Sequence, residues 1–359
     1  MRRMDKNYVA VIGASLLLSA CGGGDSADTV NNATPPTPPI ATTLVGASFF
    51  KTDPATPAYS PVGDFDIDSF ALLNRQRRLL GMPEVVRNSV ISSAAAAHSS
   101  YQVTNLAPGH YEDATKPGFT GVSPQDRVTA AQYKTNYVGE VLVYWTGDYR
   151  QTTAPAQLLF DAPFHRLGIL TSGTNAGSGY ASGTGKPAAH AWTWDIVDYK
   201  EALAARQALV YPYPTQTNAP YSWINNETPN PLASRPDLSG VTVGYPITMQ
   251  IRSGDTLDVA TFTITDSRGT NVACEKLDHN NSTETRANFT LCTPYASLKG
   301  NETYTVAVNG AINATSFSLG WQFSTTANQA AINSYDSRDT AYPPVVVPDP
   351  DGPYLKHLD

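Results

Sequence analysis

The stretch "AAHAWTWDIVDY" (residues 188–199) decides the fold, because aromatic and β-branched side chains alternate in it with small or polar ones. This period of two predicts a β-strand with one buried face. Trp192, Trp194 and Ile196 share that face, and we expect them to pack beneath a helix; a platform on which a ligand stacks is the alternative. A similar run, "YVGEVLVYW" (residues 137–145), predicts a second strand in the same unit.

Sequence patterns typical of helices occur before the first of these strands along the chain and between the two. A first helix is predicted to begin with Asp68 or Ser69 as its cap, and a second to run from about residue 89 to residue 105. A third begins at "SPQDR" (residues 123–127), where serine and aspartate form a capping box around a proline at the first helical position. The fourth is predicted within "APAQLLFDAPFHRLGIL" (residues 154–170). Helices and strands therefore share one α+β unit.

The composition changes after this α+β unit, which we place at residues 63–205. Residues 206–237 are dense in Pro and Asn and predict a linker. Residues 238–327 hold short alternating strands separated by Gly, Asp and Asn turns, which predicts an all-β sandwich with immunoglobulin-like topology. Residues 328–359 have no periodicity, so we expect an extended tail.

Two cysteines fall in neighbouring strands of the predicted sandwich. In an exported chain, two cysteines within one small domain favour a disulfide, so we expect Cys274 and Cys292 to be bonded. By the chain-entropy argument such a bond contributes about 3 kcal/mol. A pair of free, buried thiols is the alternative.

The composition points to an exported protein. The formal charge is -7 and charged residues make up only 15% of the chain. Gly, Pro, Ser, Thr, Asn and Tyr are abundant, as in exported proteins rich in strands and turns. Because phosphate binding needs clustered Lys and Arg, this balance argues against nucleic acid as a partner.

The first residues predict export and a lipid anchor. Residues 1–20 combine a basic start, a short apolar run and small residues, which is typical of a signal peptide and too short to span a bilayer. "LSAC" (residues 18–21) resembles the lipobox of bacterial lipoproteins, so we expect acyl chains on Cys21 and a tether at residues 21–62. By the same resemblance, Gly22 favours the outer membrane. An ordinary signal peptide that happens to contain a cysteine is the alternative.

Familiar enzyme motifs are missing from the sequence. It contains no H-E-x-x-H, G-x-S-x-G or C-x-x-C pattern, and "GSGYASGTGKP" (residues 177–187) lacks the spacing of a phosphate-binding loop and is predicted to be a turn. Histidines remain as candidates. His98 lies on the apolar face of a predicted helix and is expected to pack half-buried, and His190 is expected at the surface. His110 and His165 are the candidates for chemistry.

Five segments in order resemble the bacterial branch of the CAP superfamily, which includes cysteine-rich secretory proteins, insect venom antigens and plant pathogenesis-related proteins. The segments are "FALLNRQRRLLGMPEVVRNSVISSAAAAHSSYQ", "PGHYEDATKPGFTGVSPQDRVTAAQY", "VGEVLVY", "LLFDAPFHRLGIL" and "AWTWDIVDY", within residues 64–200. The resemblance implies an α-β-α sandwich around a small antiparallel sheet. It also implies a large cleft lined by two histidines and two acidic residues, which in some members binds a divalent metal, often zinc.

The resemblance assigns residues to this cleft. His110 of "PGH" matches the family's "FSH", Glu140 of "VGEV" matches "GEN", and His165 of "APFHR" matches "SPGHR". The helix motif that supplies a second acidic residue in eukaryotic members is replaced, so Asp161 or Asp195 is a candidate fourth group, or the site has only three. Two histidines and one carboxylate can bind Zn²⁺ with an open position. A hydrogen-bonded cluster without metal is the alternative.

Two functions follow from this cleft. The favoured one is a membrane-anchored binding protein whose cleft holds a divalent metal or a small ligand, glycan, lipid or peptide, while the sandwich acts as a spacer or adhesion module. The alternative is a metal-dependent hydrolase that acts on peptide or cell-wall material. We favour binding, and expect no enzyme, because the missing acidic residue removes the obvious general base.

Overall fold

A computed structural model describes residues 43–329, 344–347 and 349–355 of the chain. All described residues belong to one compact unit within residues 40–359, and residues 1–39 lie outside the described part of the chain. The predicted signal peptide and Cys21 lie there too and stay predictions. None of the helices in the described ranges has both the length and the apolar character that crossing a membrane requires.

A mixed sheet runs through the predicted α+β unit, with the strand order β16-β4-β6-β5-β3 and with β17 also paired to β4. Its strands are β3 (Val86–Arg87), β4 (Val138–Thr146), β5 (Gly173–Ser182), β6 (Ala189–Tyr199), β16 (Val345–Val347) and β17 (Tyr354–Leu355). β4 and β6 carry the two sequences that predicted strands, so both predictions are confirmed. Trp192, Trp194 and Ile196 lie in a buried hydrophobic cluster, as expected for packing residues.

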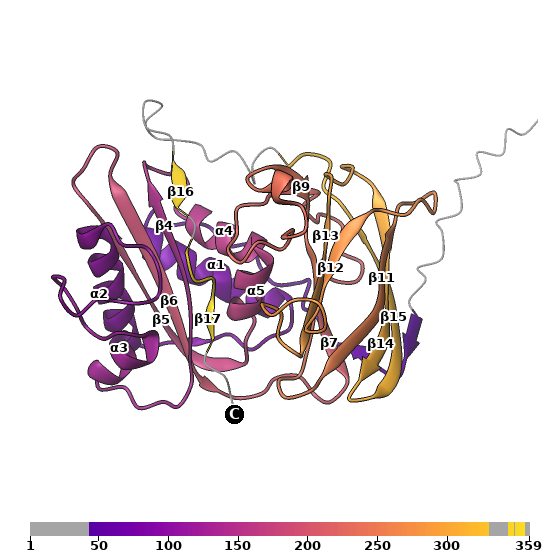
Figure 1. The fold of residues 1–359 in the computed structure, drawn as a ribbon, viewed down its shortest axis with the longest axis horizontal. Helices are drawn as coiled ribbons and strands as arrows, with labels where there is room; N and C mark the ends of the chain where they lie inside the picture. Colours follow the sequence, from indigo (N-terminus) through magenta and orange to yellow (C-terminus); the bar gives the residue numbers. More distant parts are fainter. Residues whose placement is uncertain (1–42, 330–343, 348, 356–359) are drawn as a thin grey trace, which may run out of the picture. The chain divides into compact units, whose positions relative to one another are not determined.

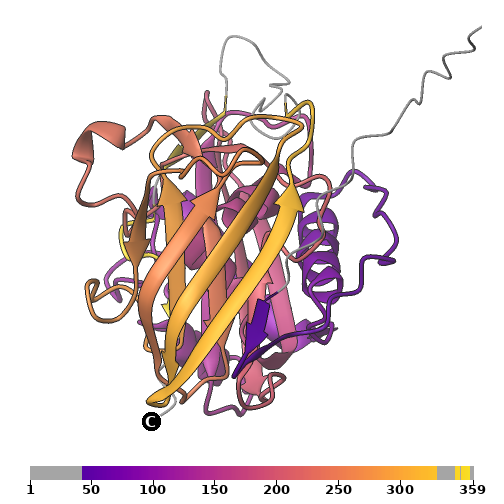
Figure 2. The ribbon, with the colours of Figure 1, turned by 90° about the vertical axis from the view of Figure 1, so that its right-hand side faces the viewer.

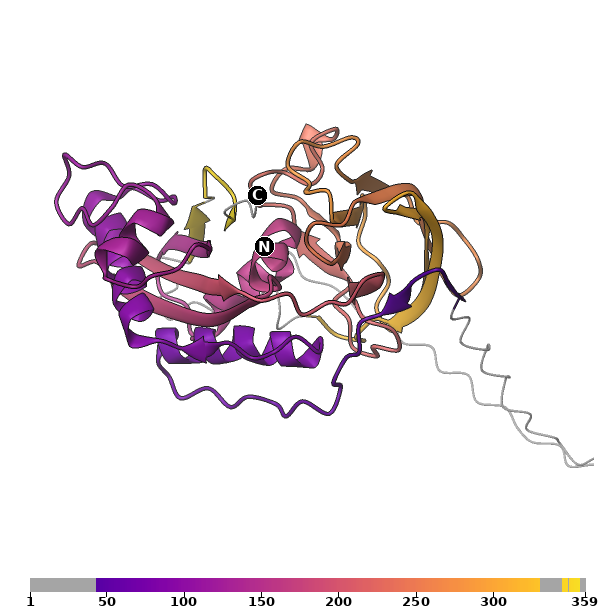
Figure 3. The same cartoon turned by 90° about the horizontal axis from the view of Figure 1, so that it is seen from below.

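Helices lie on both faces of this sheet (Figures 1 and 3). They are α1 (Phe65–Leu79), α2 (Ser89–Asn105), α3 (Pro124–Ala130), α4 (Ala154–Asp161) and α5 (Pro163–Ile169). α2 and α3 cover one face, and α1, α4 and α5 lie on the other (Figure 1). This arrangement confirms the α+β class.

Local sequence explains where the helices begin and end. α2 and the capping box that starts α3 are as predicted. α1 begins earlier than predicted, because the side chain of Asp64, not Asp68, accepts hydrogen bonds from the first N–H groups of the helix. Pro163 divides the predicted fourth helix into α4 and α5, because its ring pushes Ala162 into an extended conformation.

The glycine-rich stretch predicted to be a turn belongs instead to β5 for half of its length. Gly177 and Gly179 lie against α2, so closely that a Cβ on either would overlap with the main chain at Ser92 or Ala96. Glycine in a strand interior often marks such a close approach of another backbone. The glycines therefore serve the packing of helix on strand, which a motif search does not reveal.

A β-sandwich forms the rest of the described chain. One sheet has the order β1-β15-β14-β11 and the other β12-β13-β10-β7-β2, with a buried hydrophobic cluster between them. In Figure 2 the orange and yellow strands of the first sheet face the viewer. The strands are β1 (Thr43–Val45), β2 (Ser48–Phe49), β7 (Gln207–Tyr211), β10 (Ile247–Ile251), β11 (Leu257–Thr265), β12 (Cys274–Leu277), β13 (Phe289–Pro294), β14 (Thr303–Ile312) and β15 (Thr315–Ser324), beside a small pair, β8 (Ser222–Ile224) and β9 (Thr242–Gly244). Its immunoglobulin-like topology stays a prediction.

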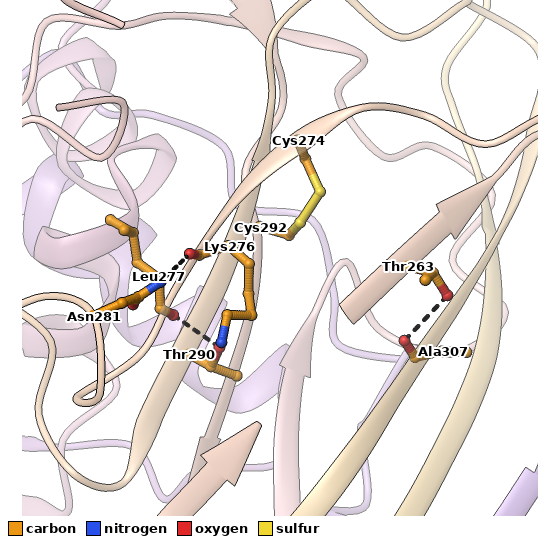
Figure 4. Close-up of a disulfide and its surroundings, with 8 residues drawn as sticks. All are labelled: Thr263, Cys274, Lys276, Leu277, Asn281, Thr290, Cys292 and Ala307. Carbon is orange, nitrogen blue, oxygen red and sulfur yellow. Dashed lines mark hydrogen bonds between the residues drawn. A yellow bond between two sulfur atoms is a disulfide. The ribbon is translucent and has the colours of Figure 1, made fainter. Parts of the chain in front are cut away.

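The predicted disulfide is confirmed (Figure 4). Cys274 of β12 and Cys292 of β13 have their Cα atoms 5.6 Å apart. The pairing of the strands brings the cysteines together. Lys276 lies directly opposite Cys292, and Cys274 lies two residues before Lys276 on the same strand, so the two cysteines are diagonal neighbours. Along the same pair, the Thr290 hydroxyl donates to the main-chain oxygen of Leu277 at 2.8 Å.

Segments predicted as tether, linker and tail also supply strands. Residues 43–49 provide β1 and β2, and residues 207–211 provide β7, all within the sandwich. Residues 345–355 pair with β4 as β16 and β17. These strands were not predicted, because each has only two to five residues and lies in a Pro- and Thr-rich stretch. Each also pairs with a strand far away in the sequence, and such a pairing cannot be read from local patterns.

The two predicted domains share a hydrophobic core. One cluster of buried side chains joins Trp145 and Phe160 of the α+β unit to Tyr211, Trp223 and Tyr245 from beyond residue 206. The predicted boundary between residues 205 and 206 is therefore not a boundary of packing. The Pro- and Asn-rich segment contributes to this core as well as connecting the two halves.

Arg166 of α5 bonds to residues on the other side of the predicted boundary. Its guanidinium donates to the Tyr245 hydroxyl at 2.8 Å and to the main-chain oxygen of Pro246 at 3.1 Å. It also lies over the Tyr211 ring, with 4.8 Å from Cζ to the ring centroid. Because a buried guanidinium needs acceptors for its N–H groups, these contacts tie α5 to the chain that leads into the sandwich.

Candidate functional site

The three residues predicted to line a cleft come from separate elements. Glu140 lies on β4, His165 on α5, and His110 in the loop between α2 and α3. All three are buried. The structure places His110 and Glu140 in direct contact and gives His165 a different partner.

His110, Glu140 and Arg127 form a buried cluster. His110 Nδ1 lies 2.6 Å from Glu140 Oε1. Arg127 of α3 donates from Nη2 to Glu140 Oε2 at 2.6 Å and from Nη1 to the main-chain oxygen of His110 at 2.7 Å. Burial raises the pKa of Glu140, but the neighbouring guanidinium and imidazoles outweigh it, so this pKa falls well below its usual range.

The C-terminal segment, which we define as residues 344–347 and 349–355, covers the other side of His110. The Nε2–H of His110 points to the main-chain oxygen of Gly352, and Asp349 Oδ2 lies 2.9 Å from the same nitrogen. Both ring nitrogens thus face acceptors. Burial lowers the pKa of His110, but the bonds with Asp349 and Glu140 outweigh it and raise this pKa to about 10. His110 is therefore a buried cation between two carboxylates.

His98 adds a second buried pair beside the first. It was predicted to pack half-buried, but it is fully buried on α2 and bonds to polar groups. Its Nδ1 lies 2.8 Å from Glu112 Oε1, and its Nε2 lies 3.0 Å from the main-chain oxygen of Gly109. The N–H of Thr120 donates to Glu112 Oε2 at 2.6 Å. The loop after α2 folds back to bring Glu112 to His98, a long-range contact that helical periodicity cannot predict.

Asp195, one candidate fourth group, lies beside Glu140. The two residues are opposite each other in the pairing of β4 with β6. Asp195 is fully buried, and neither of its carboxyl oxygens has a hydrogen-bond partner of suitable geometry among the described residues. Burial and the adjacent Glu140 carboxylate raise the pKa of Asp195 well above its usual value. The two adjacent carboxyl groups thus have pKa values shifted in opposite directions.

Asp161, the other candidate, and His190 lie elsewhere. The Asp161 carboxylate accepts from the Tyr245 hydroxyl at 2.8 Å and from Gln157 Nε2 at 2.9 Å, and burial raises its pKa to about 6. His190, predicted at the surface, is buried and stacks on Trp145 with ring centroids 5.1 Å apart. Both side chains belong to the packing around the sheet.

His165 pairs with Glu227 of the Pro- and Asn-rich segment. Glu227 Oε1 lies 2.8 Å from His165 Nδ1 and accepts the main-chain N–H of His165 at 2.8 Å. Within the described structure, His165 Nε2 and Glu227 Oε2 are buried without hydrogen-bond partners. Both residues line a cavity of about 40 Å³, and Asp349 lines it too. Asp349 thus stands between the pairs built on His110 and on His165.

A zinc ion shared by the three predicted ligands needs lone pairs directed at one point. Glu140 instead accepts from His110 and Arg127, and His165 pairs with Glu227. In the described part of the chain, no group of three or more His, Cys, Asp or Glu side chains is arranged to hold a metal ion. The predicted ligands do not fit a shared zinc ion as they stand here, and zinc binding stays a prediction.

Comparison with solved structures gives a distant likeness. No family model and no curated protein matches the chain. The crystal structure of an extracellular protein containing an SCP domain, from Bacillus anthracis, is similar with 18% identity and a TM-score of 0.29. The match covers 38% of this chain and 40% of that protein, less than half of either. It is too distant to assign a family, and membership of the CAP superfamily stays a prediction.

One acidic partner of each histidine, Asp349 for His110 and Glu227 for His165, was not predicted from the sequence. Glu227 follows His165 by 62 residues and lies in a segment that the prediction treated as a linker. Asp349 lies in the predicted tail, within "VVVPDPDGPY" (residues 345–354). The run of three valines before it is the one local signal, since consecutive β-branched residues favour a strand.

Proposed function

We propose that the chain is an extracytoplasmic binding protein whose cleft, at the outer edge of β4, takes a ligand that carries a carboxylate. The contact of His110 with Asp349 carries this proposal, because a buried imidazole nitrogen lies 2.9 Å from a carboxylate oxygen. Export, a lipid anchor at Cys21 and an outer-membrane location belong to the same proposal and rest on the lipobox at residues 18–21.

The arrangement of donors favours an anion at this place. Both ring nitrogens of His110 face acceptors, so both carry protons to donate. Glu140 holds the inner nitrogen, and Arg127 fixes Glu140 in turn. A buried cation needs a partner of opposite charge, because an unpaired one loses its hydration without compensation. A carboxylate ligand would supply the pairing that Asp349 supplies within the chain.

One observation favours hydrolysis as a second candidate. Glu227 pairs with His165 Nδ1, and the His165 side chain, whose Nε2 has no hydrogen-bond partner among the described residues, belongs to a residue that lines the cavity of about 40 Å³. This cavity is large enough for a water molecule. An imidazole oriented by a carboxylate has the geometry of a general base. We rank binding first, because a cavity of this size admits water and no substrate. Failure of the full chain to cleave a fluorogenic peptide library would set hydrolysis aside.

Chemical rescue of Asp349→Ala tests the binding proposal. This variant removes the outer carboxylate from His110, and acetate should then occupy the vacated space. We expect acetate to shift the NMR signals of the His110 ring toward their wild-type positions and to raise the melting temperature. The wild type and Asp349→Asn should not respond, because in both a side chain already fills the place.

A second background separates this effect from general stabilisation by salt. In His110→Gln/Asp349→Ala no imidazole remains to pair with the anion, so acetate should raise the melting temperature no more than chloride does. If the His110 ring signals of Asp349→Ala do not respond to acetate, the proposal is wrong.

A further inference from the structure

β4 has an outer edge that the C-terminal segment covers only in part. On its inner side β4 pairs with β6 along its whole length, from Val138 to Thr146. On its outer side, among the described residues, only β16 and β17 pair with it. Nearly every side chain of β4 is buried. Such an apolar edge strand is a template for the addition of another strand.

The C-terminal segment bulges between its two pairings with β4. Residues 347 and 354 pair with residues 144 and 140 of β4. The segment therefore uses more residues between the two pairings than β4 does. The extra residues carry Asp349 and the main-chain oxygen of Gly352 to His110. The segment thus pairs as an extended strand at both ends and, in the middle, brings the Asp349 carboxylate to the buried His110 ring.

Further contacts fix the direction of the segment after the bulge. The Tyr354 ring lies near those of His110 and Tyr111, with centroids 6.0 Å and 6.3 Å away. Arg286 donates from Nη2 to the main-chain oxygen of Leu355 at 2.6 Å. The surroundings of the outer edge of β4 therefore offer a strand edge, a partner for a carboxylate, an aromatic contact and a donor to the main chain. These are the contacts that recognise an extended peptide.

The C-terminal segment pairs with β4 through only a few residues. Pro344, Pro350 and Pro353 flank β16 and β17 and have no N–H to donate, so they do not extend the ladder beyond these two short strands. The preceding chain is fixed separately, since Gln329 Oε1 accepts from the N–H groups of Tyr221 and Ser222 at 2.6 Å and 2.8 Å. The C-terminal segment can therefore leave β4 while the chain up to Gln329 stays attached to the sandwich.

We infer that the outer edge of β4 binds an extended peptide from another protein, one that carries an aspartate after apolar residues. The C-terminal segment occupies this place as an intramolecular competitor. The inference rests on the proposed function, because it names the ligand class of the same cleft. A peptide in trans binds only when the segment is away, so the affinity measured for the whole chain falls with the fraction that is open.

Releasing the segment in the full chain tests the inference. Gly352 has a φ of +70°, and a Cβ there would lie 2.8 Å from the main-chain oxygen of Thr228. Gly352→Val should therefore push the segment off β4. Gly254→Val is the matched control, because Gly254 has a φ of +82° and nothing within 4 Å of the added Cβ. Both variants carry the same backbone strain, and only the first disturbs the segment.

The probe is a fluorescein-labelled peptide with the sequence of residues 344–355, "PVVVPDPDGPYL". Its fluorescence anisotropy should show binding to Gly352→Val about tenfold tighter than to the wild type or to Gly254→Val. A peptide with Asn in place of the aspartate corresponding to Asp349 should bind at least several-fold more weakly, and a scrambled peptide should not bind. Hydrogen exchange should be faster at residues 345–355 of Gly352→Val, and the peptide should restore protection to residues 139–146.

The outcomes separate this inference from the proposed function. If acetate rescues Asp349→Ala but no variant binds the peptide, the carboxylate site stands and the peptide inference is wrong; failure of both overturns both. A released variant that dimerises and excludes the peptide would assign the edge to a second copy and also overturn the inference. Should Gly352→Val fail to fold, Tyr354→Ser weakens the same segment from its other end and is tested in the same way.

Discussion

Asp68 is a buried carboxylate that joins α1 to the chain before it. Among the described residues it accepts hydrogen bonds from the Tyr59 hydroxyl at 2.6 Å, from the N–H groups of Val62 and Gly63 at 2.8 Å and 2.9 Å, and from the Thr152 hydroxyl. Burial alone raises the pKa of Asp68, but these bonds outweigh it, so the pKa is lowered. Asp68 was predicted as a candidate helix cap, and the structure gives it this larger role.

Replacing this carboxylate should cost stability that depends on pH. Asp68→Asn leaves main-chain donors facing an amide, and we expect a loss of about 1–3 kcal/mol near neutral pH. A lowered native pKa means that the ionised form stabilises the fold above the unfolded pKa of about 3.9 and that this contribution disappears as the pH falls through the native value. Urea unfolding of wild type and variant should therefore differ most near neutral pH and converge in acid. A difference that stays constant with pH would contradict this account.

Single residues also show how far the site could be predicted. His110 and Glu140 were found because each lies in a short pattern that matches a family motif, and they do meet. Glu227 and Asp349 were missed because charged residues in Pro-rich segments look alike until the fold places them. Periodicity reports which face of an element a side chain occupies, and it says nothing of which distant loop covers that face.

At the scale of elements, the contact of α2 with β5 shows a strand built to accept a helix. Gly177 and Gly179 occur at alternate positions on one face of β5, where side chains would collide with the helix main chain. The Ser99 hydroxyl of α2 donates to the main-chain oxygen of Gly179 at 2.8 Å. The helix thus lies near enough to bond the strand directly.

Adding one methyl group should therefore separate these elements. In Gly179→Ala the new Cβ meets the main chain of Ala96, which cannot rotate away, so we expect a loss of about 1–3 kcal/mol in the free energy of unfolding. Gly185→Ala is the control, because its nearest contact is 3.3 Å away in a loop, and it should change stability by less than about 0.5 kcal/mol. Equal effects of the two substitutions in denaturant titrations would show that the contact is not tight.

Elements were predicted well where local signals suffice. α2, the capping box of α3 and the strands β4 and β6 follow from caps and from periods in the sequence. β5 was mistaken for a turn, because its glycines signal flexibility locally and close packing only in the fold. The bend at Pro163 follows from proline geometry and was missed because the apolar run continues past it.

At the scale of the whole molecule, composition predicts two domains joined by a linker, and one cluster of buried side chains crosses the predicted boundary. Tyr211 and Tyr245 share one buried cluster with Phe160, and the Tyr211 and Phe160 rings lie 5.1 Å apart. Segments far apart in sequence cross the predicted boundary in both directions, because β7 enters the sandwich and β16 returns to β4. Pro and Asn mark irregular backbone, and irregular backbone can be as buried as any strand.

This shared core predicts that the two halves unfold together. A fragment ending near Lys200 would lose the members of this cluster beyond residue 206, among them Tyr211, whose ring centroid lies 5.1 Å from that of Phe160. Each large apolar side chain left uncovered loses about 1.5–3 kcal/mol of burial. The same cut removes the acceptors of Arg166 beyond the boundary, which leaves part of a buried guanidinium unpaired. We therefore expect one calorimetric transition for the full chain and no cooperative melting for the fragment alone. Two separate transitions, or a fragment that melts at the temperature of the full chain, would show that each half has a core sufficient for itself.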